Sequence, residues 1–338
     1  MTAATGELAS RTATNWRRRA LRRYGWTVGV WLLLLLLIGW YTTLIPRFGS
    51  FTMSSIAKNS LPTVYLAVAQ SVAVIAGGID LGAGSLMVLS NSVSARLMDG
   101  QPFWVTGVLA VAILAGAAVL NGIVGWVIVR SRVPDIIVTL ATLFIFSGVS
   151  LMVLPSPGGG TSGGFRWIFT GSTSGVGTNF WPSLVALALP VAIVGAWLRR
   201  TRAGLSLYAV GSDHVAAYLS GVNTGRAKIT AYAVSGAFAA LAGLAITAIT
   251  ASGDPRFTNA SNGTLNSVAA VVLGGIALKG GVGSVVGSVA AGVILFILYP
   301  ILTAMSIDPN TSQVIQGLLI VAVMMVAGLL ELRRRRTE

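Results

Sequence analysis

Long apolar stretches separated by short polar segments make up most of the chain between residues 26 and 330. A helix needs about 20 predominantly apolar residues to cross the hydrocarbon core of a membrane. On that scale the pattern predicts about ten transmembrane helices, at residues 26–45, 56–77, 80–98, 103–129, 134–154, 181–198, 229–252, 264–278, 282–303 and 312–330. We therefore expect an all-α integral membrane protein whose transmembrane domain spans residues 26–330.

Two longer polar segments interrupt this series. Residues 155–180 are rich in Gly, Ser and Thr and carry a single charge, Arg166. Residues 199–228 are strongly basic and contain His214, the only histidine of the chain. A loop this long and this basic is typical of the cytoplasmic side of a membrane protein, and it has room for short helices of its own.

A polar break separates the second and third predicted spans. The sequence AGGIDLGAGS, residues 76–85, contains four glycines and Asp80. Glycine disfavours helix interiors, so we predict a broken helix near Gly77–Ile79. Broken helices occur in membranes where their backbone is buried in protein or lines a wet cavity. Asp80 either caps the following half-helix or contacts a transported solute, and the candidate residues of the break or translocation path are Gly77, Gly78, Asp80, Asn91 and Asn266.

A second glycine-rich motif, LGGIALKGGVGSVVGS, covers residues 273–288. It is not a nucleotide-binding loop, because Lys279 is followed by glycine instead of Ser or Thr and the motif follows a membrane span. We expect a tight turn that lets two helices approach closely, formed by Gly274, Gly275, Gly280 and Gly281.

The charges support a membrane topology. The chain is 54% hydrophobic and 9% charged, with mean hydropathy +0.82 and a net charge of +14. Its basic residues lie between apolar spans, which excludes a nucleic-acid-binding protein and follows the positive-inside rule. With both termini in the cytoplasm, all 23 Lys and Arg residues lie on the cytoplasmic side except Arg47, Lys58, Arg96, Arg166 and Arg256. We predict a multi-pass protein of the plasma (inner) membrane with basic cytoplasmic ends at residues 1–25 and 331–338.

The chain lacks the side chains that catalysis needs. It has no cysteine, one histidine and nine acidic residues, and no paired carboxylates or metal-ligand clusters. We therefore expect a transport subunit and not an enzyme, with no metal site and no cofactor of its own.

Four segments resemble a known family: residues 59–90, 133–153, 201–243 and 268–288. Their order and spacing are similar to those of permease subunits of ribose/xylose-type ABC importers, and the resemblance runs from about Asn59 to Val326, which is most of the chain. These permeases are related to the branched-chain amino acid permeases. The resemblance implies import of a small polar solute, with a monosaccharide favoured, driven by ATP hydrolysed on another subunit.

The resemblance also implies partners. They are a second permease copy (identical or related), a cytosolic ATPase that carries ATP and magnesium, an extracytoplasmic solute-binding protein and membrane lipid. In that family the loop matching residues 211–222 forms a short coupling helix seated in the ATPase. Here Ser212 and Asp213 are N-cap candidates, Gly221 is a stop signal, and small residues are expected to face the ATPase. The predicted ATPase-coupling residues are Gly211, Ser212, Asp213, His214, Ala216, Ala217, Leu219, Ser220 and Gly221.

Three positions depart from the family pattern. The usual Glu-Leu-Asp segment is Thr264-Leu265-Asn266, the usual Asn-Gly late in the ninth span is Tyr299-Pro300, and Asp135 stands where proline is more common. A pentose, hexose, inositol or nucleoside cargo all remain open. The alternative function is an ion-coupled secondary transporter that uses Asp80 as its coupling group.

Overall fold

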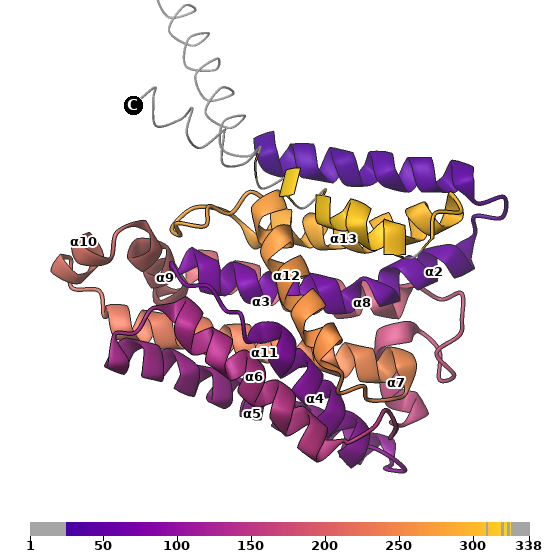
Figure 1. Ribbon diagram of the computed structural model, residues 1–338, viewed down its shortest axis with the longest axis horizontal. Helices are drawn as coiled ribbons and strands as arrows, with labels where there is room; N and C mark the ends of the chain where they lie inside the picture. Colours follow the sequence, from indigo (N-terminus) through magenta and orange to yellow (C-terminus); the bar gives the residue numbers. More distant parts are fainter. Residues whose placement is uncertain (1–24, 309, 319–320, 323–324, 326–338) are drawn as a thin grey trace, which may run out of the picture.

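The computed structural model describes residues 25–308, 310–318, 321–322 and 325, and the regular elements in these ranges are helices (Figure 1). The predicted basic ends, residues 1–24 and 331–338, lie outside the described residues. A helix at Gly25–Leu44 is followed by α2 (Ser50–Asn59), α3 (Leu61–Ile75), α4 (Ala83–Leu97), α5 (Phe103–Ser131), α6 (Asp135–Val153), α7 (Gly163–Thr170), α8 (Trp181–Arg200), α9 (Arg202–Ser212), α10 (His214–Leu219), α11 (Thr224–Thr250), α12 (Phe257–Leu273) and α13 (Val285–Ala304). Residues 310–318 are also helical.

Six of these helices are long and apolar enough to cross a membrane: Gly25–Leu44, α5, α6, α8, α11 and α13. An all-α integral membrane protein is therefore supported, but the predicted count of about ten spans is not reached. The other predicted spans fall on α3 and α4, with 15 residues each, on α12, with 17, and on a last segment that is only partly described. These helices are short because the break between α3 and α4 and the glycine turn after α12 both leave the helical conformation.

Two predicted boundaries are wrong. The eighth span was expected to begin at residue 264, whereas α12 begins at Phe257. The polar residues at its start look like a loop in the sequence, yet they belong to a helix that packs on α3 and α4. The seventh span was expected to begin at residue 229, whereas α11 begins at Thr224, with the Asn223 side chain accepting the Arg226 N–H as its N-cap. The loop between α8 and α11 is therefore shorter than the predicted 199–228.

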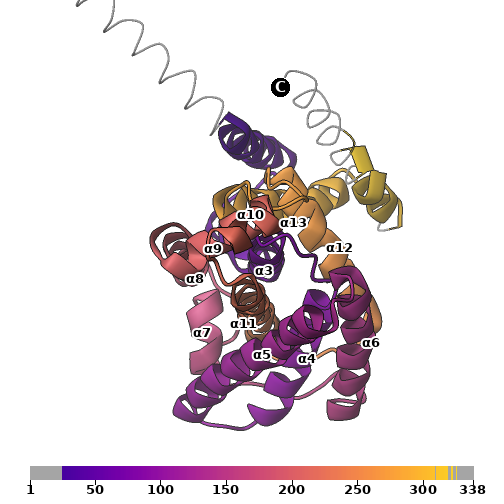
Figure 2. The ribbon, with the colours of Figure 1, turned by 90° about the vertical axis from the view of Figure 1, so that its left-hand side faces the viewer.

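Helix α11 lies at the centre of the bundle, packed against α3, α4 and α5 (Figures 1 and 2). Its buried positions are mostly small, and two of its glycines allow close helix contact. A Cβ on Gly236 would lie 2.5 Å from the Ala117 carbonyl oxygen, and one on Gly243 would lie 2.4 Å from that of Met87. Small residues at such crossings let helix backbones approach closely, so α11 is held along its length by its neighbours.

The two ends of the bundle differ in chemistry. Figure 1 shows α9 and α10 at one end and α7 at the other. At the α7 end, Arg166 donates to the carbonyl oxygens of Ala248 (3.1 Å) and Ile249 (3.3 Å), in the last turn of α11. Lys58 donates to the Gly175 carbonyl at 2.6 Å nearby. Cations stabilise the C-terminus of a helix, so both basic residues strengthen this end of the bundle.

Candidate functional site

The exposed segment at one end of the bundle contains two short helices. The carboxylate of Asp213 accepts the backbone N–H groups of Val215 and Ala216, each at 2.9 Å, and so begins α10. These two hydrogen bonds, that of Ala216 first, lower the pKa of Asp213 below its ordinary value. The charged cap therefore persists at neutral pH, and its contribution is lost only as the pH falls through that lowered pKa. Asp213 is thus confirmed as the N-cap, while Ser212 is the last residue of α9.

Of the small residues of α10 that we expected to face outward, Ala216 and Ser220 are exposed and Ala217 is buried, and larger apolar side chains are exposed beside them. Val215, Tyr218 and Leu219 are 65%, 69% and 79% exposed, whereas Ala217 is only 5% exposed and packs inside the chain. Gly211 is also buried. Of the other predicted coupling residues, Ser212, His214, Ala216, Leu219, Ser220 and Gly221 are exposed. A cluster of one aromatic and two aliphatic side chains on a short exposed helix is typical of a protein-binding surface.

Three glycine segments that are far apart in the sequence meet beside α9. A Cβ on Gly211 would lie 2.0 Å from the Ile75 carbonyl oxygen and 2.5 Å from the Gly281 nitrogen. One on Gly280 would lie 2.8 Å from the Gly77 Cα, and the Gly281 N–H donates to the Ile75 carbonyl at 3.0 Å. We call this contact of Gly77, Gly211, Gly280 and Gly281 the glycine junction. The segment that carries α10 therefore lies directly against the broken helix.

The glycine-rich motif at residues 273–288 also brings α12 and α13 together. A Cβ on Gly274 would lie 2.4 Å from the Ser288 nitrogen, and one on Gly287 would lie 2.0 Å from the Gly274 carbonyl oxygen. Gly275 has a positive φ of 83° and lies against the ring of Trp26, whose indole N–H donates to the Leu273 carbonyl at 2.9 Å. The geometry has the tight turn and the close helix approach that the sequence predicts.

The break between α3 and α4 covers residues 76–82, at the predicted place. Asp80 within it is fully buried. One carboxylate oxygen accepts the Gly82 N–H at 3.0 Å, and the other accepts Asn121 Nδ2 of α5 and Ser235 Oγ of α11, each at 2.8 Å. For the capping alternative, Asp80 holds the freed backbone and also joins α5 and α11. For the solute-contact alternative, Asp80 does not line either of the two pockets described below.

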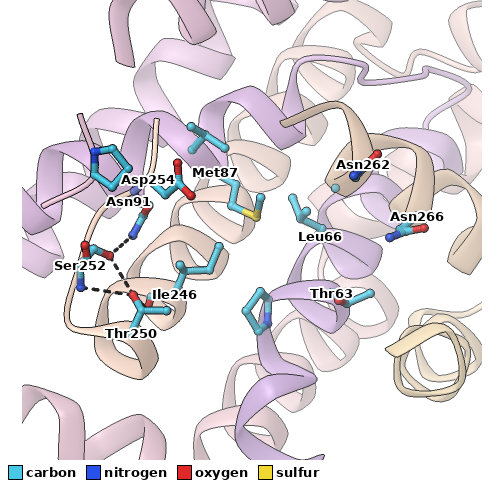
Figure 3. Close-up of a pocket in the computed structure, with 14 residues that line it drawn as sticks. Thr63, Leu66, Met87, Asn91, Ile246, Thr250, Ser252, Asp254, Asn262 and Asn266 are labelled. Carbon is cyan, nitrogen blue, oxygen red and sulfur yellow. Dashed lines mark hydrogen bonds between the residues drawn. The ribbon is translucent and has the colours of Figure 1, made fainter. Parts of the chain in front are cut away.

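A pocket of about 460 Å³ lies between α3, α4, α11 and α12, toward the α7 end (Figure 3). It contains two of the residues predicted for the translocation path, Asn91 and Asn266. The polar side chains that line it are Thr63, Asn91, Thr250, Ser252, Asp254, Asn262 and Asn266. A second pocket of about 920 Å³ shares Thr63, Asn262 and Asn266 with the first, so the two pockets adjoin, and we call them together the groove.

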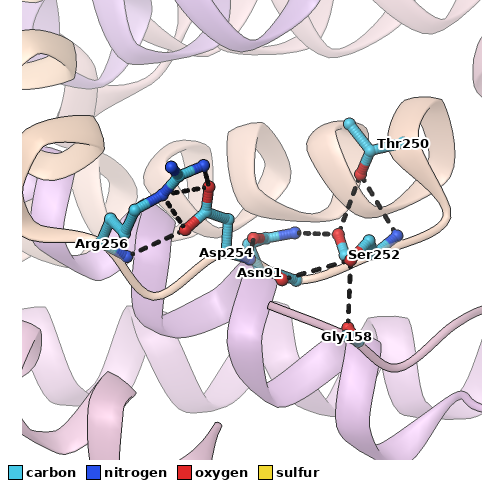
Figure 4. A network of polar contacts seen from close by, with 7 residues as sticks. Asn91, Gly158, Thr250, Ser252, Asp254 and Arg256 are labelled. Carbon is cyan, nitrogen blue, oxygen red and sulfur yellow. Dashed lines mark hydrogen bonds and ion pairs between the residues drawn. The ribbon is translucent and has the colours of Figure 1, made fainter. Parts of the chain in front are cut away.

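Asn91 also holds the loop that follows α11 (Figure 4). Its amide donates to Thr247 Oγ1 at 2.8 Å and to the Ser252 carbonyl at 3.1 Å, and its oxygen accepts the Asp254 N–H at 2.9 Å. Asp254 in turn forms an ion pair with Arg256. The side chain of Asn91 therefore fixes one wall of the pocket, a role that its position in the sequence does not reveal.

We expect Asn91→Ala to lower the free energy of unfolding by about 2 kcal/mol, because three hydrogen bonds are lost, one to α11 and two to the loop that follows it. Thermal unfolding in detergent measures the change. The matched control is Ser92→Ala, since Ser92 Oγ is buried without a hydrogen-bond partner among the described residues. Equal midpoints for the two variants would contradict the role assigned to Asn91.

Known proteins similar to this chain are membrane transport subunits. Residues 52–324 match the family described as "Branched-chain amino acid transport system / permease component". The ribose import permease protein RbsC of Escherichia coli (strain K12) is 31% identical over 304 residues, which are 87% of this chain and 91% of the relative. The fructose import permease protein FrcC of Rhizobium meliloti is 32% identical, over 81% and 77% of the two chains. The galactose/methyl galactoside import permease protein MglC of Escherichia coli (strain K12) is 28% identical, over 87% and 91%.

No solved structure matches the chain significantly. The family match nevertheless covers most of the chain, including the break, the glycine junction and α10. This chain belongs to the permease family of ABC importers, on the branch that contains the ribose-type permeases.

Proposed function

We propose that this chain is the membrane-spanning subunit of an ATP-driven importer that moves a monosaccharide inward across the plasma membrane. The observation that carries the proposal is the exposed apolar face of α10, since its segment contacts the broken helix through the glycine junction. The relatives named for ribose, fructose and galactose import support the cargo class. The ion-coupled alternative has no support from these relatives.

We propose that ATP and magnesium bind to a separate cytosolic ATPase, and that α10 docks on it. Closure of the ATPase moves α10, and α9 passes this movement through Gly211 to Gly77 at the break. The chain itself then binds no cofactor. An extracytoplasmic solute-binding protein delivers the cargo at the opposite end of the bundle, beside α7.

The proposed topology has ten spans, with both termini in the cytoplasm. It counts α2 and α3 together as the second span, α4 as the third, α12 as the eighth, and the segment that begins at residue 310 as the last. The distribution of basic residues supports it, because Lys58 and Arg166 lie together at the α7 end, away from Arg199, Arg200 and Arg202 at the start of the α9 segment.

We propose that the groove is the path of the cargo and that a second permease copy closes it. Exposed amides on membrane helices are costly against lipid, and Asn262 and Gln313 of this groove are both exposed. The first pocket has hydroxyl, amide and carboxylate groups but no aromatic side chain in its lining. This part of the groove offers hydrogen bonds to an uncharged polyol, whereas the aromatic side chains of the groove, Tyr41, Phe51, Phe296 and Tyr299, line the second pocket.

The test is the variant Tyr218→Asp, because a carboxylate on the exposed face of α10 would be desolvated in the ATPase contact. We expect it to reduce co-purification of the ATPase about tenfold or more. The control is Val176→Asp, which changes an equally exposed residue, 67% against 69%, at the opposite end of the bundle. ATPase binding that is unchanged by Tyr218→Asp would contradict the proposed docking.

A further inference from the structure

Near the glycine junction, three side chains connect the first turns of α11 to the broken helix. Lys228 Nζ lies 2.7 Å from Asp135 Oδ1, and the Tyr232 hydroxyl donates to Asp135 Oδ2 at 2.9 Å. Lys228 and Tyr232 belong to α11, one turn apart, and Asp135 begins α6. Tyr232 is fully buried, and the charged side chains are 21% and 13% exposed. Such a shielded ion pair keeps more of its strength than a surface pair.

This cluster touches the backbone of the break directly. A Cβ on Gly78 would lie 2.6 Å from Asp135 Oδ2 and 2.9 Å from the Tyr232 hydroxyl. The Ile79 carbonyl accepts Thr139 Oγ1 at 3.2 Å and lies 3.4 Å from the Tyr232 hydroxyl. The carboxylate of Asp135 and the ring of Tyr232 therefore form the wall against which residues 78 and 79 rest.

The position of Lys228 is explained by this ion pair and not by its own helix. A cation near the N-terminus of a helix is unfavourable, whereas an acid at the start of a helix is favourable. Lys228 is in the second turn of α11, and Asp135 is the first residue of α6. Asp135 thus gains from its helix terminus, whereas Lys228 lies beyond the first turn of α11 and its charge is stabilised by Asp135.

Helix α11 also begins close to α10. Only residues 220–223 separate Leu219, at the end of α10, from Thr224. Asn223 caps α11, so its first turn is rigidly formed. Four residues therefore join α10 to the capped first turn of α11, and Lys228 and Tyr232 follow in the next turns of that helix. Further along the same helix, Ser235 donates to Asp80 within the break.

We infer that Lys228, Asp135 and Tyr232 are positioning residues, which transmit the movement of α10 through α11 and α6 to the broken helix. This inference rests on the proposed function and deepens it, because it adds a second connection beside the glycine junction. The ion pair locks α6 to α11, so that the break is moved as α11 moves. Without it, α6 no longer follows α11, and residues 78 and 79 lose the support of the Asp135 carboxylate while their contacts with Tyr232 remain.

The experiment uses the reconstituted complex of this chain with its ATPase and solute-binding protein. Uptake of radiolabelled D-ribose, D-fructose or D-galactose, whichever the wild-type complex imports, is measured together with ATP hydrolysis. For Lys228→Met and for Asp135→Asn we expect the amount of sugar transported per ATP to fall about tenfold, within the usual range of coupling between sites. ATPase co-purification stays at the wild-type level, because the exposed face of α10 is unchanged.

The matched control is Arg226→Gln, which removes an exposed positive charge from the first turn of α11 without touching the ion pair. We expect it to leave the transport per ATP unchanged. The double variant Lys228→Asp with Asp135→Lys restores an ion pair of opposite direction, and we expect it to recover at least part of the transport per ATP. Lys228→Arg keeps the charge and serves as a second rescue.

A merely structural role gives a different result. A folding defect would lower transport and ATP hydrolysis in proportion, with transport per ATP unchanged, and this outcome would overturn the inference. Failure of every rescue variant to recover transport per ATP would overturn it as well. If the wild-type chain does not bind the ATPase, the proposed function is overturned. If the complex assembles and Lys228→Met transports as much sugar per ATP as the wild type, only the positioning role is overturned.

Discussion

Gly211→Ala is expected to reduce ATP-driven transport by at least about tenfold, although it adds a single methyl group. That methyl group would lie 2.0 Å from the Ile75 carbonyl oxygen and 2.5 Å from the Gly281 nitrogen. Both are backbone atoms joined by a hydrogen bond, so neither can move aside as a flexible side chain would. Overpacking of this kind costs about 1–3 kcal/mol or more, and here it separates α9 from the break.

The control for this variant is Gly116→Ala, at a helical glycine of α5 where a Cβ meets nothing within 4 Å. Alanine is favoured over glycine in helices by about 1 kcal/mol, so this variant should transport normally. Size-exclusion profiles and thermal midpoints establish that both variants are folded. A folded Gly211→Ala variant with wild-type transport per ATP would contradict the role of the glycine junction.

The local features of this site could be predicted from the sequence because their causes are local. Four glycines around Asp80 predict the break at residues 76–82, and an acid followed by a short helical stretch predicts the N-cap at Asp213. Each depends on hydrogen bonds between residues close together in the chain. The apolar character of the long helices is also local, which is why the all-α membrane class is confirmed although the count of about ten spans is not.

The features that depend on packing could not be predicted. No local signal places Gly77, Gly211 and Gly280 in contact, since close approach of three backbones is a property of the whole bundle. The orientation of α10 is likewise set by packing, so the exposed face with Tyr218 was missed. The count of about ten spans is not reached because hydropathy does not show where a helix ends: the predicted third span, residues 80–98, contains a helix of only 15 residues, α4.

The buried carboxylate of Asp80 supports the second prediction, which separates a structural role from ion coupling. We expect Asp80→Ala to lower the free energy of unfolding by about 4 kcal/mol. Three donors then lose their acceptor in a fully buried site: the Gly82 N–H, Asn121 Nδ2 and Ser235 Oγ. Each buried group left without a partner costs about 1–3 kcal/mol. The chain should accumulate poorly in the membrane and unfold at a much lower temperature.

Asp80→Asn tests the same site without removing its shape. Its side-chain oxygen can still accept the Gly82 N–H, and the Ser235 hydroxyl can rotate to accept from the new amide, whereas Asn121 faces a second donor. The expected loss is about 1–2 kcal/mol, with ATP-driven sugar uptake into liposomes largely retained and insensitive to uncouplers. A proton- or sodium-coupled transporter would lose its coupling group in Asp80→Asn, so its sugar uptake would be abolished. If this chain takes up sugar by itself, and if both Asp80→Asn and uncouplers abolish that uptake, transport is ion-coupled and not ATP-driven.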